Sequence, residues 1–507
     1  MREAYFDGYH EAPVEDRNIQ PMSITHAEAS DRLRQHGQEH ILRFWSDLSE
    51  AEQETLLQDI EEVDFDLLMR LIKDLVLTEP APEYFDRIEP VDVIPPPEPG
   101  RPDADAAFEA GEEALRAGRV AAIVVAGGQG TRLGCSGPKG AYPIGPITGK
   151  PLFEYHAEKI LNIQDRYGCA VPWYIMVSEA NHAETRHCFE SHGYFGLEPD
   201  EVVFFQQAMV PCVDEAGFML LDQRHRLARN PTGHGGVIPA MAESGVCAHA
   251  KERGIDVFSY FQVDNWALQV IDPYFIGYHL LHNAEMSSKS HRKQQVRENV
   301  GIHCMCDGEY RVIEYSELDR FPQLLETDAD GKPIHFAGNP AIHVLSAGFV
   351  ERMYRNYAQF PWHKAHKKIA YVNEAGDRVV PEAPNGYKFE TFVFDALRFT
   401  CHDPLVVEIR RKNEYTPIKQ LTGPNSAEEA RRLRTQWWAE WLEAAGYSVP
   451  RDENGWVLHP IEISPRFAMT KDEFLRKADG FAWPTDGPLA IGPNGEIEAA
   501  YAIESAT

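Results

Sequence analysis

A short apolar run with a glycine-rich loop directly after it constrains the fold of this 507-residue chain more than any other feature. The run Val120–Val125 contains only apolar residues, as strands do that are buried on both faces of a parallel sheet. Ala126-Gly-Gly-Gln-Gly-Thr-Arg-Leu-Gly134 follows it, and Pro138-Lys-Gly140 comes soon after. Three glycines let this backbone turn tightly and approach a ligand closely: Gly127, Gly128 and Gly130. The pattern predicts a phosphate-binding loop at the carboxyl end of a first strand.

Two common phosphate motifs do not fit this loop. The G-x-G-x-x-G fingerprint would need a third glycine at the position of Leu133. A P-loop would need one more residue between Gly145 and Lys150, and a serine or threonine after that lysine instead of a proline. The alternative is an ordinary glycine-rich turn between a strand and a helix. Arg132 and Lys139 disfavour it, because they add positive charge where phosphates would lie.

Strands and helical stretches alternate between residues 105 and 400. Four mostly apolar runs predict strands: Val120–Val125, Trp173–Val177, Val202–Phe205 and Val257–Val263. Pro151–Arg166 has the pattern of a helix between the first two. This order predicts the α/β class, with a mostly parallel central sheet and helices on both faces. Ligands of such sheets bind at the carboxyl ends of strands, where the glycine-rich loop and Asp264 both fall.

Helical segments are predicted on both sides of this region. Within residues 24–77, the stretch Gln38–Leu48 has Ile41, Trp45 and Leu48 at helical spacing, and Ser49-Glu-Ala-Glu52 is a capping box for the next helix. Ala427–Ala445 is predicted as one helix with four inward-facing side chains: Leu433, Trp437, Trp441 and Leu442. The proline-rich Ile94–Gly100 indicates a stiff connector. We therefore expect a helical N-terminal module and linker (1–100), an α/β domain (101–400) and a small C-terminal domain (401–507).

Charge and composition exclude several classes of function. The formal net charge of −30 argues against a nucleic-acid surface, which needs a basic stripe. No apolar run approaches the length of a membrane span, and the acidic Met1–Asn18 does not resemble a signal peptide. The 8 cysteines form no C-x-x-C pair, as expected for free thiols in a reducing compartment. We expect a cytoplasmic protein with no nucleic-acid or membrane partner.

The loop and many ordered motifs resemble one enzyme family. Ala126–Gly134 with Pro138-Lys-Gly140 resembles the signature of nucleotidyltransferases that make UDP-sugars, and the chain is most similar to the eukaryotic-type UDP-N-acetylhexosamine pyrophosphorylases. The resemblance extends over nearly the whole chain. It includes Gly37-Gln-Glu-His-Ile-Leu-Arg-Phe-Trp45, Phe204-Phe-Gln-Gln207, Val263-Asp-Asn265, Ile271-Asp-Pro273, Val300-Gly301, Val312-Ile-Glu-Tyr-Ser-Glu317, Gly338-Asn339, Lys367-Lys-Ile369, Pro384-Asn-Gly-Tyr-Lys-Phe-Glu390, Phe392-Val-Phe-Asp395 and Glu414-Tyr-Thr-Pro-Ile-Lys419.

The resemblance implies a Rossmann-like nucleotidyltransferase domain and a specific reaction. UTP and N-acetylglucosamine 1-phosphate would give UDP-N-acetylglucosamine and pyrophosphate, by attack of the sugar phosphate on the α-phosphate. Both reactants are anions, so positioning and charge stabilisation should dominate catalysis, with Mg²⁺ as cofactor. The catalytic cations would be Arg132, Lys139 and Lys388. The nucleotide would be bound by Ala126, Gly127, Gly128, Gly130, Gln207, Gly233 and Asp264.

Asp264 and the sugar side complete the predicted site. Asp264 follows an apolar strand, where a carboxylate is costly to bury unless it meets a cation, so it is the candidate Mg²⁺ ligand; a helix N-cap is the alternative. The resemblance places seven residues at the sugar or its phosphate: His234, Gly301, Glu314, Asn339, Phe392, Phe394 and Lys419. Alternating Phe392 and Phe394 would also suit plain strand core. His363-x-x-His366 lacks a third ligand and is typical of surface residues.

One residue departs from the family pattern. The hexosamine branch usually has asparagine where His234 stands, and Gly233-His-Gly-Gly236 partly resembles the G-H-G-D pattern of UDP-glucose pyrophosphorylases. A UTP-glucose-1-phosphate or broad sugar-1-phosphate uridylyltransferase is therefore an alternative. A catalytically silent nucleotide-sugar-binding relative is a third hypothesis. Retention of Arg132, Lys139, Asp264 and Lys388 argues against it.

Overall fold

The computed structural model describes residues 24–78, 83–402 and 404–498, and they form two compact units. The first unit is built from Met1–Pro80, Val210–Asn230 and Lys364–Lys388. The second is built from Ala81–Met209, Pro231–His363 and Phe389–Thr507. The expectation about Met1–Asn18 falls outside the described residues. The three-part division at residues 100 and 400 stays a prediction.

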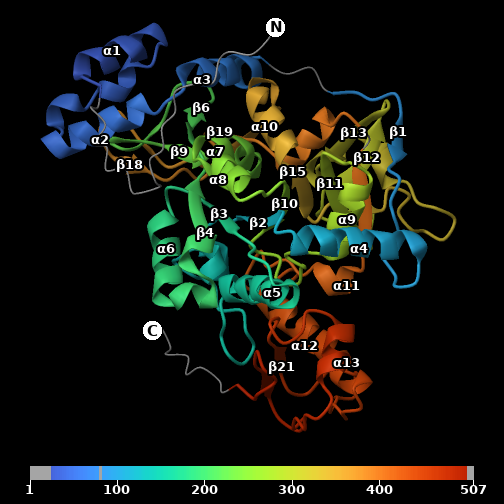
Figure 1. Ribbon diagram of the computed structural model, residues 1–507. Helices are drawn as coiled ribbons and strands as arrows, with labels where there is room; N and C mark the ends of the chain where they lie inside the picture. The colour runs from blue at the N-terminus through green and yellow to red at the C-terminus, as the bar shows by residue number, and fades with distance from the viewer. Residues whose placement is uncertain (1–23, 79–82, 403, 499–507) are drawn as a thin grey trace, which may run out of the picture. The chain divides into compact units, whose positions relative to one another are not determined.

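Three helices and small sheets make up the first unit (Figure 1). The helices are α1 (His26–Gln35), α2 (Glu50–Glu61) and α3 (Phe65–Leu71), and the last continues into a π-helical turn, Ile72–Leu77. The capping box at the start of α2 is confirmed, since Ser49 Oγ accepts from the Glu52 N–H at 3.4 Å. The predicted helix over Gln38–Leu48 is wrong, because this stretch forms two short 3₁₀ helices, Glu39–Leu42 and Trp45–Asp47.

The remaining chain of the first unit forms short antiparallel pairs. β6 (Val213–Asp214) pairs with β19 (Gly386–Glu390), whose other edge meets β16 (His363–Lys367). Two further hairpin-like pairs are β7 (Leu221–Gln223) with β8 (Arg226–Leu227), and β17 (Tyr371–Val372) with β18 (Arg378–Val379).

An eleven-stranded sheet forms the centre of the second unit. Its main order is β1-β12-β14-β11-β15-β10-β2-β3-β4, with β13 beside β12 and β20 beside β11. The strands are β1 (Ile88–Pro90), β2 (Val120–Val125), β3 (Trp173–Val177), β4 (Val202–Gln206), β10 (Val257–Gln262), β11 (Met286–Arg292), β12 (Ile302–Cys306), β13 (Glu309–Ile313), β14 (Ala337–Gly338), β15 (His343–Ser346) and β20 (Leu405–Ile409).

Parallel pairing is confined to part of this sheet. The four predicted strands β4, β3, β2 and β10 are mutually parallel, as expected, and so are β11 and β20. Beyond β10 the chain returns antiparallel: β15 pairs with both β10 and β11 in that sense. The sheet is therefore mixed, with a parallel core, and the α/β class is confirmed. β2 and β10 run in register from Val120 opposite Val257 to Val125 opposite Gln262, so the residues that follow both strands meet at one edge.

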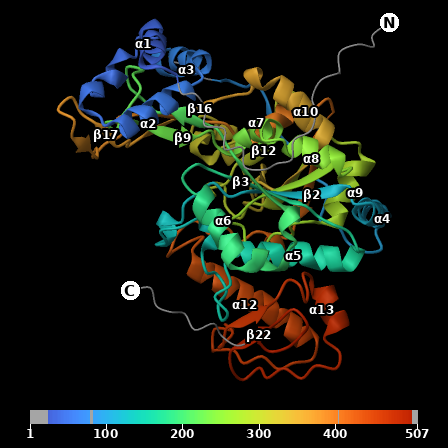
Figure 2. The ribbon, with the colours of Figure 1, turned by 60° about the vertical axis from the view of Figure 1, so that its left-hand side comes forward.

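Helices cover both faces of the sheet (Figures 1 and 2). Alternate residues of β2 point to opposite faces, so they belong to two different hydrophobic cores. Val120, Ala122 and Val124 belong to the core beneath α4 (Pro102–Arg116), α5 (Leu152–Tyr167), α6 (His182–Ser191) and α9 (Pro273–Leu281). Ala121 and Ile123 belong to the opposite core, beneath α7 (Val237–Glu243), α8 (Val246–Glu252) and α10 (Ala347–Arg355). Because β2 is buried on both faces, its sequence Val120–Val125 is apolar throughout.

The C-terminal part of the second unit is built around a tryptophan-rich helix. It contains α11 (Arg411–Glu414), α12 (Ala427–Ala444), α13 (Lys471–Lys477) and the parallel pair β21 (Ile461–Ile463) and β22 (Leu489–Ile491). Trp437, Trp441 and Leu442 of α12 are buried as predicted. The prediction for Leu433 is wrong, because its side chain is exposed: the core-facing position of that turn belongs to Arg434.

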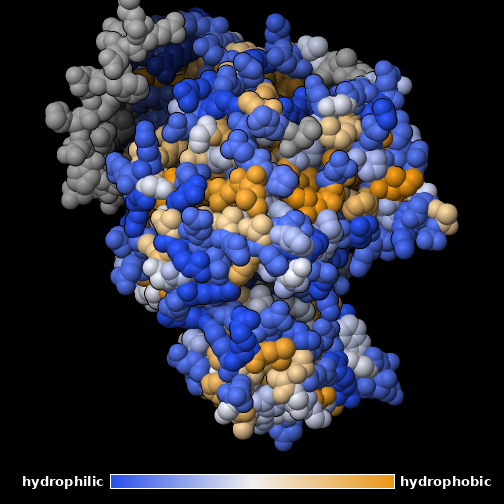
Figure 3. Space-filling view, turned by 45° about the vertical axis from the view of Figure 1, so that its right-hand side comes forward, coloured by the Kyte–Doolittle hydropathy of each residue, from blue (hydrophilic) through white to orange (hydrophobic). Residues whose placement is uncertain are grey.

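Figure 3 shows a mostly hydrophilic face with small apolar groups between the polar side chains. Within the described ranges, no helix is long and apolar enough to cross a membrane.

Candidate active site

The two halves of the glycine-rich signature are hydrogen-bonded to each other at the end of β2. The Gly130 N–H donates to the Gly137 carbonyl at 2.9 Å, and the Lys139 N–H donates to the Gly128 carbonyl at 3.1 Å. A Cβ at Gly130 would lie 3.1 Å from the Gly137 oxygen, a tight contact, so the close approach of these two loop segments favours glycine. At Gly128, by contrast, a Cβ would meet nothing within 4 Å, so this position faces open space. The loop is a folded cradle with one open side.

Two polar residues after β3 hold this loop in place, and the sequence analysis missed both. Ser178 Oγ donates to the Gly127 carbonyl at 2.9 Å, and Asn181 Nδ2 donates to the Ala126 carbonyl at 2.8 Å. Both side chains are almost fully buried. The available signal was a pair of small polar residues at the carboxyl end of the strand next to β2, where a parallel sheet collects functional side chains.

An ion pair joins the loop to the neighbouring strand. Lys139 Nζ lies 2.7 Å from Asp264 Oδ2, and the two side chains are only 19% and 15% exposed. Burial raises the pKa of the Asp264 carboxyl, but the charge and hydrogen bond of Lys139, with the charge of Lys419, outweigh it, so the pKa lies below its ordinary value. Asp264 is thus an ionised carboxylate beside the phosphate cradle.

The position of Asp264 fits one part of a Mg²⁺ site. The N-cap alternative is wrong, since the next helix, α9, is capped by Asp272. Across the residues described, no cluster of three or more His, Cys, Asp or Glu side chains could hold a metal by itself. Mg²⁺ usually takes one or two carboxylates and completes its shell with water and substrate phosphates. A single ionised carboxylate at the phosphate cradle suits that mode, whereas it would not suit an all-protein metal site.

Of the predicted base-reading residues, Gln207 lies against the same loop, and Gly233 lies against Thr391. A Cβ on Gly127 would meet Gln207 Nε2 at 2.4 Å, so glycine at 127 lets the amide pack onto the loop backbone. Gln207 is 7% exposed, and its Oε1 has no hydrogen-bond partner among the described residues. A buried acceptor without a donor is costly, and a ligand N–H would satisfy it. Gly233 has φ +82°, and a Cβ there would lie 2.6 Å from the Thr391 carbonyl, so this turn requires glycine.

Three predicted sugar-side residues meet at the antiparallel part of the sheet. The Asn339 N–H donates to the Gly301 carbonyl at 2.8 Å. A Cβ on Gly301 would lie 2.8 Å from Glu314 Oε1, so the carboxyl packs directly over the glycine. Burial, and then the charge of Glu317, raise the pKa of Glu314 to about 7. Near neutral pH this carboxyl can therefore both donate and accept hydrogen bonds.

An aromatic cluster surrounds His234. Its ring stacks on Phe392 with centroids 5.3 Å apart and lies 5.6 Å from Phe394. His234 Nδ1 accepts from the Val393 N–H at 3.1 Å, and burial lowers the pKa of His234 to about 4, so the ring is neutral with its proton on Nε2. The strand part of the alternative for the two phenylalanines is wrong, because Val393–Phe399 is a 3₁₀ helix with Phe392 directly before it. The core part holds for Phe394, which is buried in a hydrophobic core against which Phe392 packs.

His363 belongs to the same cluster, which the sequence analysis did not anticipate. Its ring stacks on Phe392 at 4.4 Å, and its Nε2 lies 2.7 Å from Asp395 Oδ2. Burial lowers the pKa of His363, but the hydrogen bond and charge of Asp395 raise it by more. The pKa of His363 therefore lies above its ordinary value. No sequence signal linked this histidine to Phe392, since 28 intervening residues separate them and most belong to the other unit.

The three remaining cations occupy different places. Lys419 is exposed, yet its charge lowers the pKa of both Asp264 and Glu314, so it acts on two of the predicted site residues. Arg132 is exposed on the 3₁₀ turn Thr131–Leu133. Lys388 is half-buried on β19 and belongs to the first unit, whereas the other predicted site residues belong to the second.

Comparison with known proteins identifies the family. Residues 93–423 match the family described as UTP–glucose-1-phosphate uridylyltransferase. "UDP-N-acetylglucosamine diphosphorylase 2" of Arabidopsis thaliana is 33% identical over 88% of this chain and 90% of its own length. "UDP-N-acetylglucosamine pyrophosphorylase" of Saccharomyces cerevisiae is 33% identical over 82% and 90%. The crystal structure of the uridine diphosphate N-acetylglucosamine pyrophosphorylase from Trypanosoma brucei superposes with a TM-score of 0.74 at 27% identity, over 90% of this chain and 96% of that one. The chain belongs to the UTP–glucose-1-phosphate uridylyltransferase family.

Proposed function

We propose that this protein is a uridylyltransferase that converts UTP and N-acetylglucosamine 1-phosphate to UDP-N-acetylglucosamine and pyrophosphate. The observation that carries this proposal is the Lys139–Asp264 ion pair, 2.7 Å long, beside the folded glycine-rich cradle. A cation for the phosphates and an anion for a metal stand together at the carboxyl edge of β2 and β10. Phosphoryl-transfer sites need that combination.

The chain's own residues supply the parts that the reaction requires. The glycine-rich cradle would bind the triphosphate, with Lys139 and Arg132 neutralising its charge. Gln207 would hydrogen-bond the uracil, since its buried Oε1 has no donor among the described residues. Lys419 would hold the phosphate of the sugar, and its charge would offset the repulsion between the two anionic reactants. Mg²⁺ held by Asp264 would supply Lewis-acid stabilisation of the phosphate charge.

Several finer features are also part of the proposal. We infer a Rossmann-like nucleotidyltransferase domain within residues 101–400, a helical N-terminal module and a small C-terminal domain. We also infer a cytoplasmic enzyme that requires Mg²⁺ and has no nucleic-acid partner. The parallel core of the sheet supports the first inference, and the net charge of −30 supports the absence of a nucleic-acid surface.

The sugar is assigned from the relatives and from the pocket chemistry. The named plant and yeast relatives act on UDP-N-acetylglucosamine according to their names, whereas the family description names glucose 1-phosphate. Phe392, Phe394 and His234 form an apolar, stacked surface that suits the methyl group of an acetamido sugar. His234 is also the observation that favours the second candidate, a broader sugar-1-phosphate uridylyltransferase.

A panel assay tests the proposal directly. The purified protein is incubated with UTP, Mg²⁺ and one of four sugar 1-phosphates: N-acetylglucosamine, N-acetylgalactosamine, glucose or galactose. Pyrophosphate release and the UDP-sugar are both measured. We expect the highest kcat/KM with N-acetylglucosamine 1-phosphate and no pyrophosphate release when the sugar is omitted. Absence of product with every sugar would contradict the reaction, and a preference for glucose 1-phosphate would contradict the assigned sugar.

A further inference from the structure

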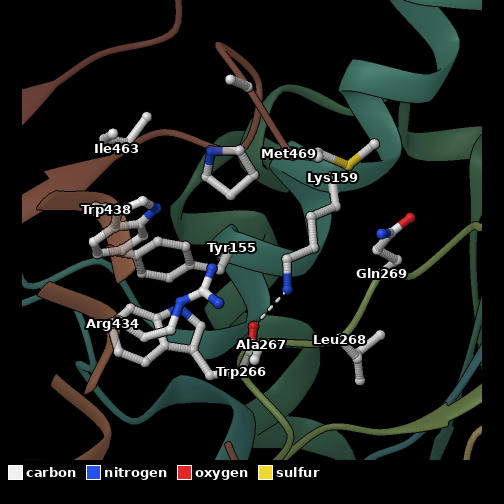
Figure 4. Close-up of a pocket in the computed structure, with 12 residues that line it drawn as sticks. Tyr155, Lys159, Trp266, Ala267, Leu268, Gln269, Arg434, Trp438, Ile463 and Met469 are labelled. Atoms are coloured by element: carbon white, nitrogen blue, oxygen red, sulfur yellow. Dashed lines mark hydrogen bonds between the residues drawn. The ribbon is translucent and has the colours of Figure 1, made fainter. Parts of the chain in front are cut away.

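A small cavity in the second unit lies apart from the residues assigned to the reaction (Figure 4). It is bounded by α5, α12, the segment Trp266–Gln269 and residues after β21. Its volume is about 20 Å³, which is room for one water-sized species. Two of its lining residues are cations: Lys159 from α5 and Arg434 from α12.

Both cations are buried, with exposed fractions of 5% for Lys159 and 6% for Arg434. In Figure 4 their nitrogen atoms point toward each other across the cavity. Lys159 Nζ donates to the Trp266 carbonyl at 2.6 Å. The Nε and Nη1 atoms of Arg434 have no hydrogen-bond partner among the described residues, although the guanidinium stacks 3.8 Å from the ring centre of Trp437. Arg434 therefore lines the cavity with a guanidinium group whose hydrogen-bonding capacity is only partly used within the protein.

The described lining of this cavity contains no Asp or Glu to balance these charges. The carboxylates that act on Lys159 from farther away are already paired: Glu158 with Lys150 at 2.8 Å, and Glu414 with Lys289. Glu462, next to Tyr155, accepts from that hydroxyl and from the Thr148 N–H. Two buried like charges with no counter-charge are strongly unfavourable. Burial lowers the pKa of Lys159 well below its ordinary value, and the charge of Arg434 lowers it further.

We propose that this cavity is a binding site for a single small inorganic anion, chloride, held between Arg434 and Lys159. A halide accepts several N–H donors at once and has about the size of the space, whereas tetrahedral phosphate exceeds it. Trp266 and Trp438 also line the cavity, and their apolar rings lower the local polarity and so strengthen the attraction. The bound anion supplies the missing counter-charge and keeps Lys159 protonated.

The bound chloride ties together three segments of the second unit. α5 and α12 supply the two cations, and Trp266 supplies the carbonyl that Lys159 binds. Trp266 follows Asp264 by two residues, and Asn265 between them donates to the Glu414 carbonyl at 2.8 Å. Because only the folded chain forms this site, chloride should raise the stability of the protein by mass action. This inference does not depend on the proposed reaction.

Thermal unfolding of the full chain tests the site. Tm is measured from about 1 mM to about 200 mM sodium chloride, with sodium gluconate holding the ionic strength constant. We expect Tm to rise by at least about 2 °C over this range. The increment should vanish in Arg434→Met and in Lys159→Met, whatever their own Tm in gluconate. Arg432→Met is the matched control, because Arg432 is exposed on the same helix and also lies over a tryptophan, 4.2 Å from the ring of Trp456.

A second measurement does not depend on the variants folding. Crystals of the unmodified protein grown in sodium bromide should show one anomalous peak between Arg434 and Lys159. A Tm that is equal in chloride and gluconate, together with no anomalous peak, would mean that the cavity holds water and a neutral Lys159, and the proposal would be overturned. A chloride effect that persists undiminished in Arg434→Met and Lys159→Met would also overturn it, since the anion would then bind elsewhere.

Discussion

Lys139 and Asp264 are 125 residues apart in the chain, yet their side chains form a half-buried ion pair 2.7 Å long at the edge of the central sheet. The pair exists because β2 and β10 are parallel neighbours, so that the loops after them meet. Each residue balances the other's charge. Binding a triphosphate with Mg²⁺ would give each a new partner of opposite sign, which makes the pair a preformed charge pattern for the substrate.

Lys139→Ala should lower kcat/KM by roughly 10²–10⁴-fold, on the order of 3–5 kcal/mol of transition-state stabilisation. The reason is the loss of a fixed positive charge at the phosphate cradle. Steady-state kinetics at saturating Mg²⁺ measures it. Lys251→Ala, at an exposed position on α8, is the matched control and should behave as the unmodified protein does. Near-unmodified turnover in Lys139→Ala would contradict its assignment.

Asp264→Asn should move the Mg²⁺ activation curve to higher concentration and lower the maximal rate. An amide keeps the shape of the side chain but removes the charge that a hard cation prefers. Activity is measured against Mg²⁺ concentration at fixed UTP, with Asp200→Asn, an exposed site, as control. An activation curve that coincides with that of the unmodified protein would leave Asp264 only its pairing with Lys139.

Glu314 should make the free energy of unfolding depend on pH. Its pKa is raised from 4.5 to about 7 in the folded protein, so between these values the folded state keeps a proton that the unfolded state releases. The stabilisation that Glu314 contributes is therefore fully present below about pH 4.5. It decreases as pH rises from there through 7, by at most about 3 kcal/mol in total. Glu314→Gln mimics the protonated form and should flatten this slope in denaturant titrations from pH 5 to 8. Glu351→Gln, exposed on α10, should keep it.

His234→Asn should increase the preference for N-acetylglucosamine 1-phosphate over glucose 1-phosphate by roughly 2–10-fold, the scale of one hydrogen bond. His234 presents a single Nε2–H, because its Nδ1 already accepts from Val393, whereas asparagine offers a donor and an acceptor. The unmodified protein should accordingly show detectable activity with glucose 1-phosphate. Competition assays with both sugars give the ratio of kcat/KM values. An unchanged ratio would assign the preference to the pocket around Gly301 and Asn339.

Local sequence was sufficient for the parallel half of the fold. Val120–Val125 is apolar along its whole length, and Val257–Gln262 is so apart from Ser259 and Gln262, because both faces of the parallel core are covered by helices. The glycine-rich loop was equally recognisable, since Gly130 and Gly140 sit where a Cβ would strike backbone or the ring of Phe153. These signals survive in a single sequence because burial on two faces and forbidden Cβ positions restrict residue type directly.

Tertiary structure decided what depends on partners distant in the chain. Three such features leave no periodic pattern in the sequence. They are the antiparallel position of β15 between β10 and β11, the stacking of His363 on Phe392, and the hydrogen bonds of Ser178 and Asn181 to the loop. On α12, helical spacing alone predicted a buried Leu433. In the structure Arg434 is buried instead, and its side chain points toward Lys159. Periodicity shows which side chains share one face of a helix. Which charged or aromatic groups contact that face depends on a segment from elsewhere in the chain that packs against it.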